Sequence, residues 1–344
     1  MNTEVALTRI FSKNAVLASI YYLLFNRSFY REHRSVLAGR IAYKASLKKI
    51  DSSNYLLRRN IHRLEKGLIM RPRRPIFALD YIAETIEIYG RSVSSQKLCI
   101  SEAKWATDVL TEYFNVVTAN KLIERLANDF NEYKDSYFRL LANRKLENES
   151  PNFIPYPSSK LPKLEVTSDS LHQLFLRRRS TRWFEETPVA KELLLQAIDM
   201  ASLAPSACNR QPYQFKILTQ ASAAQRVAKL AMGTSGFVEN IQTLIVVVGD
   251  LSAYPFERDR HCIYIDASLA SMQLMLALET MGLSTCPINW PDIESREMKM
   301  QEMLSLPHYL RPVMLIAVGY ADKNGGIPYS QKKSSQTLAD FIEL

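Results

Sequence analysis

Residues 177–184 have the sequence RRRSTRWF, and residues 204–212 have the sequence APSACNRQP. In the first stretch Arg178, Ser180 and Arg182 alternate, so an extended backbone would place all three side chains on one side. Guanidinium groups suit phosphate because they form paired, charge-assisted hydrogen bonds with it. The second stretch is a short polar turn after an apolar helical pattern. Either stretch alone is also typical of a solvated surface, but the pair indicates a site for a phosphate-bearing cofactor.

The two stretches resemble the nitroreductase family of FMN-dependent oxidoreductases, in which an RRSxRxF segment is followed by an APSxxNxQPWxF segment. Tyr213 stands here in place of the tryptophan. Residues 265–288, IDASLASMQLMLALETMGLSTCPI, resemble the long central helix of the family and the loop after it. Residues 315–322, LIAVGYAD, resemble its last core strand. The resemblance covers residues 165–344 and implies an α+β fold, bound FMN, NAD(P)H as electron donor and a homodimer.

The resemblance also implies roles for single residues. Arg178, Ser180 and Arg182 match positions that hold the FMN phosphate and the ribityl–pyrimidine side, and Asn209 matches a flavin contact made from the partner subunit. An amide such as Asn209 can both donate to and accept from the ring edge. The full set expected to bind the cofactor is Arg178, Arg179, Ser180, Arg182, Pro205, Ser206, Asn209, Gln211, Pro287, Ile288, Asn289, Lys332 and Lys333.

No side chain is expected to act as a catalytic acid or base, and no metal is expected. The backbone N–H groups at Asn289 and Trp290 match those that face flavin N5, where a donor stabilises the reduced ring. Many family members carry Gly or Glu-Gly at this point, so Trp290 either narrows the substrate pocket or anchors the loop. Ser335 stands where the family usually has an arginine, and Lys332 or Lys333 would replace its charge.

These two departures keep other functions open. One alternative is a flavin-binding scaffold or regulatory protein that has lost its redox activity and docks through its basic N-terminal half. Another is a binding protein whose active part is that basic half, with the flavin domain serving only as a dimerisation platform.

The charge of the chain is strongly asymmetric. Its formal net charge is +9, and residues 1–100 contain 18 Lys and Arg against 7 Asp and Glu, which leaves 26 against 28 in the rest. This excess predicts an anionic partner for residues 1–100: a membrane surface, nucleic acid or a phosphorylated substrate. A membrane surface or a membrane-bound biosynthetic partner is favoured. Nucleic acid is disfavoured because the chain has no RNP motif or zinc-finger spacing. A basic surface that only aids solubility is the alternative.

Composition and the positions of the prolines predict the domain organisation. Residues 1–150 are expected to form a basic helical domain, with a helical bundle over 80–148 whose aromatic stripes are core. The prolines of residues 151–164 predict a linker. Residues 165–344 are expected to form the nitroreductase-like domain. In the latter we expect helices over 170–179, 191–201 and 264–281, and strands over 214–218, 244–248 and 313–318.

Location is predicted from cysteines and apolar runs. Four widely spaced cysteines without CxxC spacing indicate a reducing compartment, with neither disulfide framework nor zinc site. The apolar run 15–25 is too short to span a bilayer. We therefore expect a cytoplasmic protein, or one peripheral to the inner face of the membrane. Residues 62–68, HRLEKGL, resemble the leading region of nitroreductase-like proteins associated with bacterial surface-polysaccharide biosynthesis.

Overall fold

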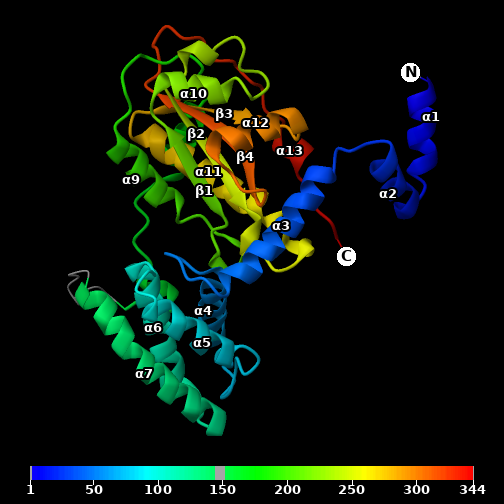
Figure 1. Cartoon of the computed structure of the whole chain (residues 1–344). Helices are drawn as coiled ribbons and strands as arrows, with labels where there is room; N and C mark the ends of the chain where they lie inside the picture. Colours follow the sequence, from blue (N-terminus) through cyan, green and yellow to red (C-terminus); the bar gives the residue numbers. More distant parts are fainter. Residues whose placement is uncertain (1, 144–151, 344) are drawn as a thin grey trace.

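The computed structural model describes residues 2–143 and 152–343, and it combines an antiparallel sheet with many helices (Figure 1). The N-terminal helices are α1 (Asn2–Phe11), α2 (Ala15–Leu24), α3 (Tyr30–Ser46), α4 (Tyr55–Leu68), α5 (Ile82–Ser94), α6 (Ile100–Val116) and α7 (Lys121–Asn143). The C-terminal helices are α8 (Ser168–Arg177), α9 (Lys191–Ala201), α10 (Ala221–Ala228), α11 (Cys262–Thr280), α12 (Glu294–Leu304) and α13 (Ser335–Leu338). The strands are β1 (Tyr213–Leu218), β2 (Thr243–Asp250), β3 (Ser284–Asn289) and β4 (Leu310–Gly319). The expected α+β class is confirmed.

Helices cover both faces of the sheet, whose strand order is β1-β2-β4-β3 with every pair antiparallel. All eight residues of β2 are buried. Ile245 and Val247 face a core that α9 and α11 complete, whereas Val246 and Val248 face the core under α10 and α12. A strand covered on both faces reads as a continuous apolar run, which is why the sequence pattern located β2.

Helices α4 to α7 form a second core of their own, below the sheet in Figure 1. This bundle includes α4 and so begins earlier than the expected residue 80, and residues 144–148 of the expected range lie outside the described residues. Tyr89, Phe130 and Tyr137 of the predicted aromatic stripes lie within it, so these stripes are core, as predicted. Gly90 allows α7 to approach closely, because a Cβ at that position would lie 2.4 Å from the ring of Tyr133.

Helix α3 packs on the sheet domain although it precedes the bundle in sequence. Val36 shares a small core with Leu251 and Ile263, and a Cβ at Gly39 would lie 2.8 Å from the backbone oxygen of Leu251. Arg40 donates from Nε to the backbone oxygen of Pro255 at 3.2 Å. The division into domains at 150 and 165 stays a prediction.

Two elements differ from the sequence expectations. Residues 286–289 were expected in a loop but belong to β3, which is the edge strand beside β4 in the sheet and can therefore accommodate Pro287. Helix α8 spans Ser168–Arg177 instead of the expected 170–179. It begins at Ser168 because Thr167 is the N-cap, whose side chain accepts from the N–H of Ser170.

Helix α11 is central to the sheet domain but is not covered on every side within one chain. Its buried face includes Ala267, Leu274 and Leu278. Its outer face leaves Ile265 58%, Leu269 43% and Met272 39% exposed. The segment Glu257–Thr280 is long and apolar enough to cross a membrane by composition, yet half of the tested window is buried in the protein.

Candidate functional site

The predicted arginine cluster lies beside the first residues of β3. Ser180 pairs with Thr285 in an isolated bridge, and the N–H of Thr181 donates to the carbonyl oxygen of Thr285 at 3.0 Å. Burial raises the pKa of the nearby Cys286 thiol, and the positive charges of Arg182 and Arg178 oppose that increase. Both guanidinium groups therefore act on the same short segment of β3.

The donors of this cluster are not used up by carboxylates. Within the described residues neither Arg178 nor Arg182 forms an ion pair, and Arg182 donates only from Nη1 to the backbone oxygen of Ser180 at 3.2 Å. The buried hydroxyl of Thr285 has no hydrogen-bond partner in the described part of the chain. Two guanidinium groups and an unpaired hydroxyl fit the phosphate of FMN.

The remaining predicted cations come from a neighbouring loop and the C-terminal tail. Arg179 points to this tail and donates from Nη2 to the backbone oxygens of Pro328 and Tyr329. Lys332 and Lys333 follow shortly after and are exposed. Arg179 therefore ties the tail to the cluster instead of leaving its own donors open.

Residues 205–211, here named the cofactor loop, have an unusual backbone. Cys208, Asn209 and Gln211 have positive φ angles of 53°, 51° and 50°. Such a conformation costs a residue other than glycine roughly 1–2 kcal/mol, and asparagine tolerates it best. Strain of this kind persists only where surrounding contacts impose it, and it is concentrated at functional sites.

Contacts to the rest of the domain fix the cofactor loop. The N–H of Ala207 donates to Asp266 Oδ2 at 2.9 Å, and the N–H of Gln211 donates to Ser206 Oγ at 3.0 Å. Burial raises the pKa of Asp266, although the hydrogen bonds from the N–H of Ala207 and the hydroxyl of Tyr254 favour the carboxylate. Asp266 therefore anchors the loop to α11. The sequence offered a signal for it, since it is an acid in an apolar helix.

The cofactor loop and the arginine cluster lie at opposite ends of α11. Asp266 in the first turns of the helix holds the loop, whereas Glu279 in its last turn pairs with Arg177 Nε at 3.0 Å, next to the cluster. At 1.5 Å per residue these two acids are separated by roughly 20 Å along the helix. A single chain does not bring the two predicted motifs together.

The turn after β3 lies at the far end of that strand from the arginine cluster. Asn289 is exposed, whereas Trp290 is buried and donates from Nε1 to Glu297 Oε1 at 2.8 Å. Of the two alternatives left by the sequence, the structure shows Trp290 anchoring the turn. Thr285 and Asn289 are separated by roughly 13 Å along the strand.

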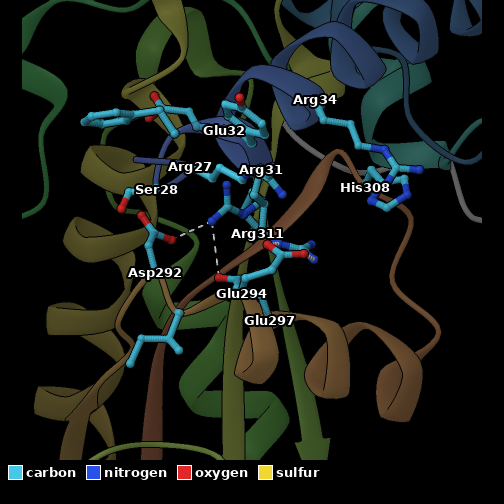
Figure 2. Close-up of a pocket in the computed structure, with 13 residues that line it drawn as sticks. Arg27, Ser28, Arg31, Glu32, Arg34, Asp292, Glu294, Glu297, His308 and Arg311 are labelled. Atoms are coloured by element: carbon cyan, nitrogen blue, oxygen red, sulfur yellow. Dashed lines mark hydrogen bonds and ion pairs between the residues drawn. The ribbon is translucent and has the colours of Figure 1, made fainter. Parts of the chain in front are cut away.

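A cavity of about 810 Å³ separates the start of α3 from the start of α12 (Figure 2). Arg31 donates to both carboxylate oxygens of Glu294 at 2.6 Å, and Arg311 bonds to Asp292 at 2.5 Å and to Glu297 at 3.2 Å. Part of the basic excess of residues 1–100 is therefore directed inward, where it joins α3 to the sheet domain. Burial lowers the pKa of His308 in this cavity, and the charges of Arg34 and Arg31 add to the effect.

The sequence model of the nitroreductase family matches residues 176–235 and 230–320, the region that carries the arginine cluster, the cofactor loop and β3. The C-terminal half of this chain is a nitroreductase-family domain. This domain makes the protein an oxidoreductase, and the family is FMN-dependent. Within the described residues no group of three or more His, Cys, Asp and Glu could hold a metal ion.

Relatives match the nitroreductase domain along most of their own length. YodC of Bacillus subtilis, whose name assigns it to the NAD(P)H nitroreductases, is 26% identical over 189 residues, 45% of this chain and 91% of its own. The iodotyrosine deiodinase of Haliscomenobacter hydrossis is 24% identical over 225 residues, 55% of this chain and 97% of its own. A solved FMN-dependent nitroreductase from Clostridium difficile R20291 is 21% identical, with a TM-score of 0.42, and covers 50% of this chain and 98% of its own.

Proposed function

We propose that the protein binds FMN in its nitroreductase domain and uses NAD(P)H to reduce a small-molecule substrate. The observation that supports this most is the pair Arg178 and Arg182, whose donors are left open beside β3. These residues would hold the phosphate, and the backbone at Asn289 and Trp290 would lie at the ring. Bound FMN would supply hydride-transfer chemistry. The protein's own part is to orient the ring and to present backbone donors to the position where negative charge develops.

We propose that the working unit is a homodimer. The exposed apolar face of α11 supports this, because a contiguous apolar surface of this kind marks an interface. The separation of the cofactor loop from the arginine cluster supports it as well. Because one chain does not bring them together, Ser206, Asn209 and Gln211 would serve the FMN bound by the partner.

For the substrate we propose a small molecule used in bacterial surface-polysaccharide biosynthesis. The resemblance of residues 62–68, HRLEKGL, supports this placement. The names of the relatives describe reductions of two different compound classes, nitro compounds and iodotyrosine, so the shared chemistry is reductive.

An absorbance spectrum of the purified protein tests the proposal. We expect flavin bands, release of FMN rather than FAD on denaturation, and bleaching of the bands when NADPH or NADH is added without oxygen. Flavin bands that neither nicotinamide bleaches would support the scaffold function instead. Protein that stays colourless after incubation with FMN would refute the proposed site.

A second proposal concerns the first two helices, which lie apart from the rest of the molecule in Figure 1. Within the described chain α2 has no buried residue, and Val16, Leu23 and Leu24 are largely exposed. The basic residue Arg27 follows closely. We propose that α2, an apolar helix with a basic neighbour, anchors the protein to the anionic inner face of a membrane.

Liposome flotation checks this anchor. We expect binding to phosphatidylglycerol vesicles at low salt and loss of binding at high salt, since each basic residue contributes about 1 kcal/mol that salt screens. Deleting residues 1–28 should abolish binding and leave FMN bound, because it retains α3. If the full-length protein does not bind these vesicles at low salt, the membrane proposal is wrong and the basic surface is only solvated. Vesicles of neutral lipid are the control.

A further inference from the structure

Arg58 of α4 connects the bundle of α4 to α7, here named the helical half, to the cofactor loop. Its Nε donates to the backbone oxygen of Asn209 at 2.9 Å, and its Nη2 donates to Gln211 Oε1 at 3.0 Å. Its Nη1 donates to Glu102 Oε2 at 2.9 Å. The side chain is only 15% exposed, so this planar group is fixed on three sides.

Other residues of the helical half hold the side chain of Arg58 in place. Glu102 is buried and also accepts from the hydroxyl of Ser53 at 2.6 Å and from the N–H of Asn54 at 3.0 Å. The guanidinium lies 5.5 Å from the ring centroid of Trp105, a cation–π distance. Arg58 therefore moves only if the bundle around it moves.

A polar chain continues from Trp105 into the HRLEKGL segment. Trp105 donates from Nε1 to Glu65 Oε1 at 2.9 Å, and Glu65 Oε2 lies 3.2 Å from His62 Nδ1. Glu65 and His62 of this segment are thus connected, through Trp105, to the residue that contacts the loop. None of this was apparent in the sequence.

The contacts of Arg58 fall on the strained part of the loop. Asn209 and Gln211 both have positive φ, and both belong to the set expected to contact FMN. Asp266 and Ser206 bind other groups of the loop, namely the N–H of Ala207 and the N–H of Gln211. Without Arg58 the carbonyl of Asn209 and the side-chain oxygen of Gln211 would lose their protein donor, and the backbone between them could relax.

We infer that Arg58 is a positioning residue for the flavin site, and that through it the helical half sets the conformation of the cofactor loop. The inference rests on the proposed function, in which this loop contacts the FMN of the partner subunit. Arg58 would then act on the partner's flavin and not on the flavin of its own chain.

The test compares Arg58→Ala and Arg58→Lys with Arg63→Ala. Arg63 lies on the same helix, but it bonds to Asp80 at 3.0 Å and packs over Tyr81 within the helical half. Arg58→Lys keeps a cation beside Glu102, whereas one ammonium group cannot serve Glu102, Asn209 and Gln211 together. FMN affinity is measured by fluorescence titration, and melting temperature and near-UV circular dichroism report folding.

We expect Arg58→Lys to melt within a few degrees of the parent protein and yet to bind FMN about tenfold more weakly, because the cofactor loop loses at least one of the charge-assisted hydrogen bonds that hold its conformation. Arg58→Ala should bind FMN more weakly still, and Arg63→Ala should bind it normally. If the parent binds FMN and both Arg58 variants bind it equally well, the inference is wrong while the proposed function stands. If the parent does not bind FMN, the proposed function itself fails.

Mixed dimers separate positioning from a general loss of structure. Arg58→Ala damages the loop that a chain offers to its partner, whereas Arg182→Ala damages the phosphate site of its own chain. After subunit exchange between these two variants, one site of each mixed dimer has both groups intact and should bind FMN with parental affinity. If exchange is shown to occur and no tight site forms, action across the dimer is refuted.

Discussion

Leu269→Glu is expected to convert the protein into a monomer that no longer retains FMN. Leu269 lies at the middle of the exposed face of α11, with Ile265 one turn before it and Met272 one turn after it. A dimer built on this face would bury the new carboxylate among apolar side chains, which costs several kcal/mol for an unpaired charge. Sedimentation velocity gives the oligomeric state, and absorbance of the same fractions gives the FMN content.

Phe138→Glu is the matched control for this substitution. Phe138 is a similarly exposed apolar side chain, 51% exposed, but it lies on α7 in the helical half. We expect this variant to remain a dimer with parental FMN content. A Leu269→Glu protein that still sediments as a dimer would show that α11 does not form the dimer interface. A monomer that retains FMN would show that one chain completes the site, contrary to the arrangement proposed here.

Arg182→Ala is expected to raise the dissociation constant for FMN about 10- to 100-fold, which corresponds to about 1.4–2.7 kcal/mol and lies in the range for a hydrogen bond to a charged group. The stability of the protein without flavin should change little, because the guanidinium bonds only to the Ser180 carbonyl in the described structure and lies 5.7 Å from the ring centroid of Phe237. Fluorescence titration with FMN measures the affinity, and thermal melting of the flavin-free protein measures the stability.

Arg226→Ala serves as the charge-matched control, because Arg226 is exposed on α10, on the other side of the sheet from α11. It should bind FMN like the parent. Arg182→Lys should lie between the parent and the alanine variant, since an ammonium group keeps the charge and loses the paired geometry. Equal affinity of Arg182→Ala and the parent would mean that the phosphate is held elsewhere.

The secondary structure that could be predicted from the sequence is the part that depends on local pattern. Helix α9 has the predicted bounds 191–201, and β2 extends the predicted strand by one residue at its start and two at its end. Strand β3 was missed because Pro287 cannot donate to a strand ladder and Asn289 is depleted in strands, and the edge position in the sheet tolerates the proline. The packing of α3 was missed because it depends on the fit of Gly39 to Leu251, far along the chain.

For the candidate site, the resemblance supplied residue types and the structure supplied their arrangement. The motifs named Arg182 and Asn209 as parts of one site, and only the geometry shows that they lie at opposite ends of α11 within a chain. Arg58 carries no local signal, since an arginine on an amphipathic helix is ordinarily a surface residue. Its contact with the cofactor loop arises from tertiary packing between two cores, which periodicity does not encode.

The packing of α3 has a consequence for the order in which the chain folds on the ribosome. Arg40 and the carbonyl of Pro255 that it contacts are 215 residues apart in sequence. At roughly 5–20 residues per second, synthesis leaves α3 without its docking surface for about 10–40 s. The bundle of α4 to α7 can form meanwhile from contiguous sequence, whereas the apolar face of α3 stays uncovered on the nascent chain until its docking surface has been synthesised. Chaperone dependence during translation is therefore expected to concentrate on this helix.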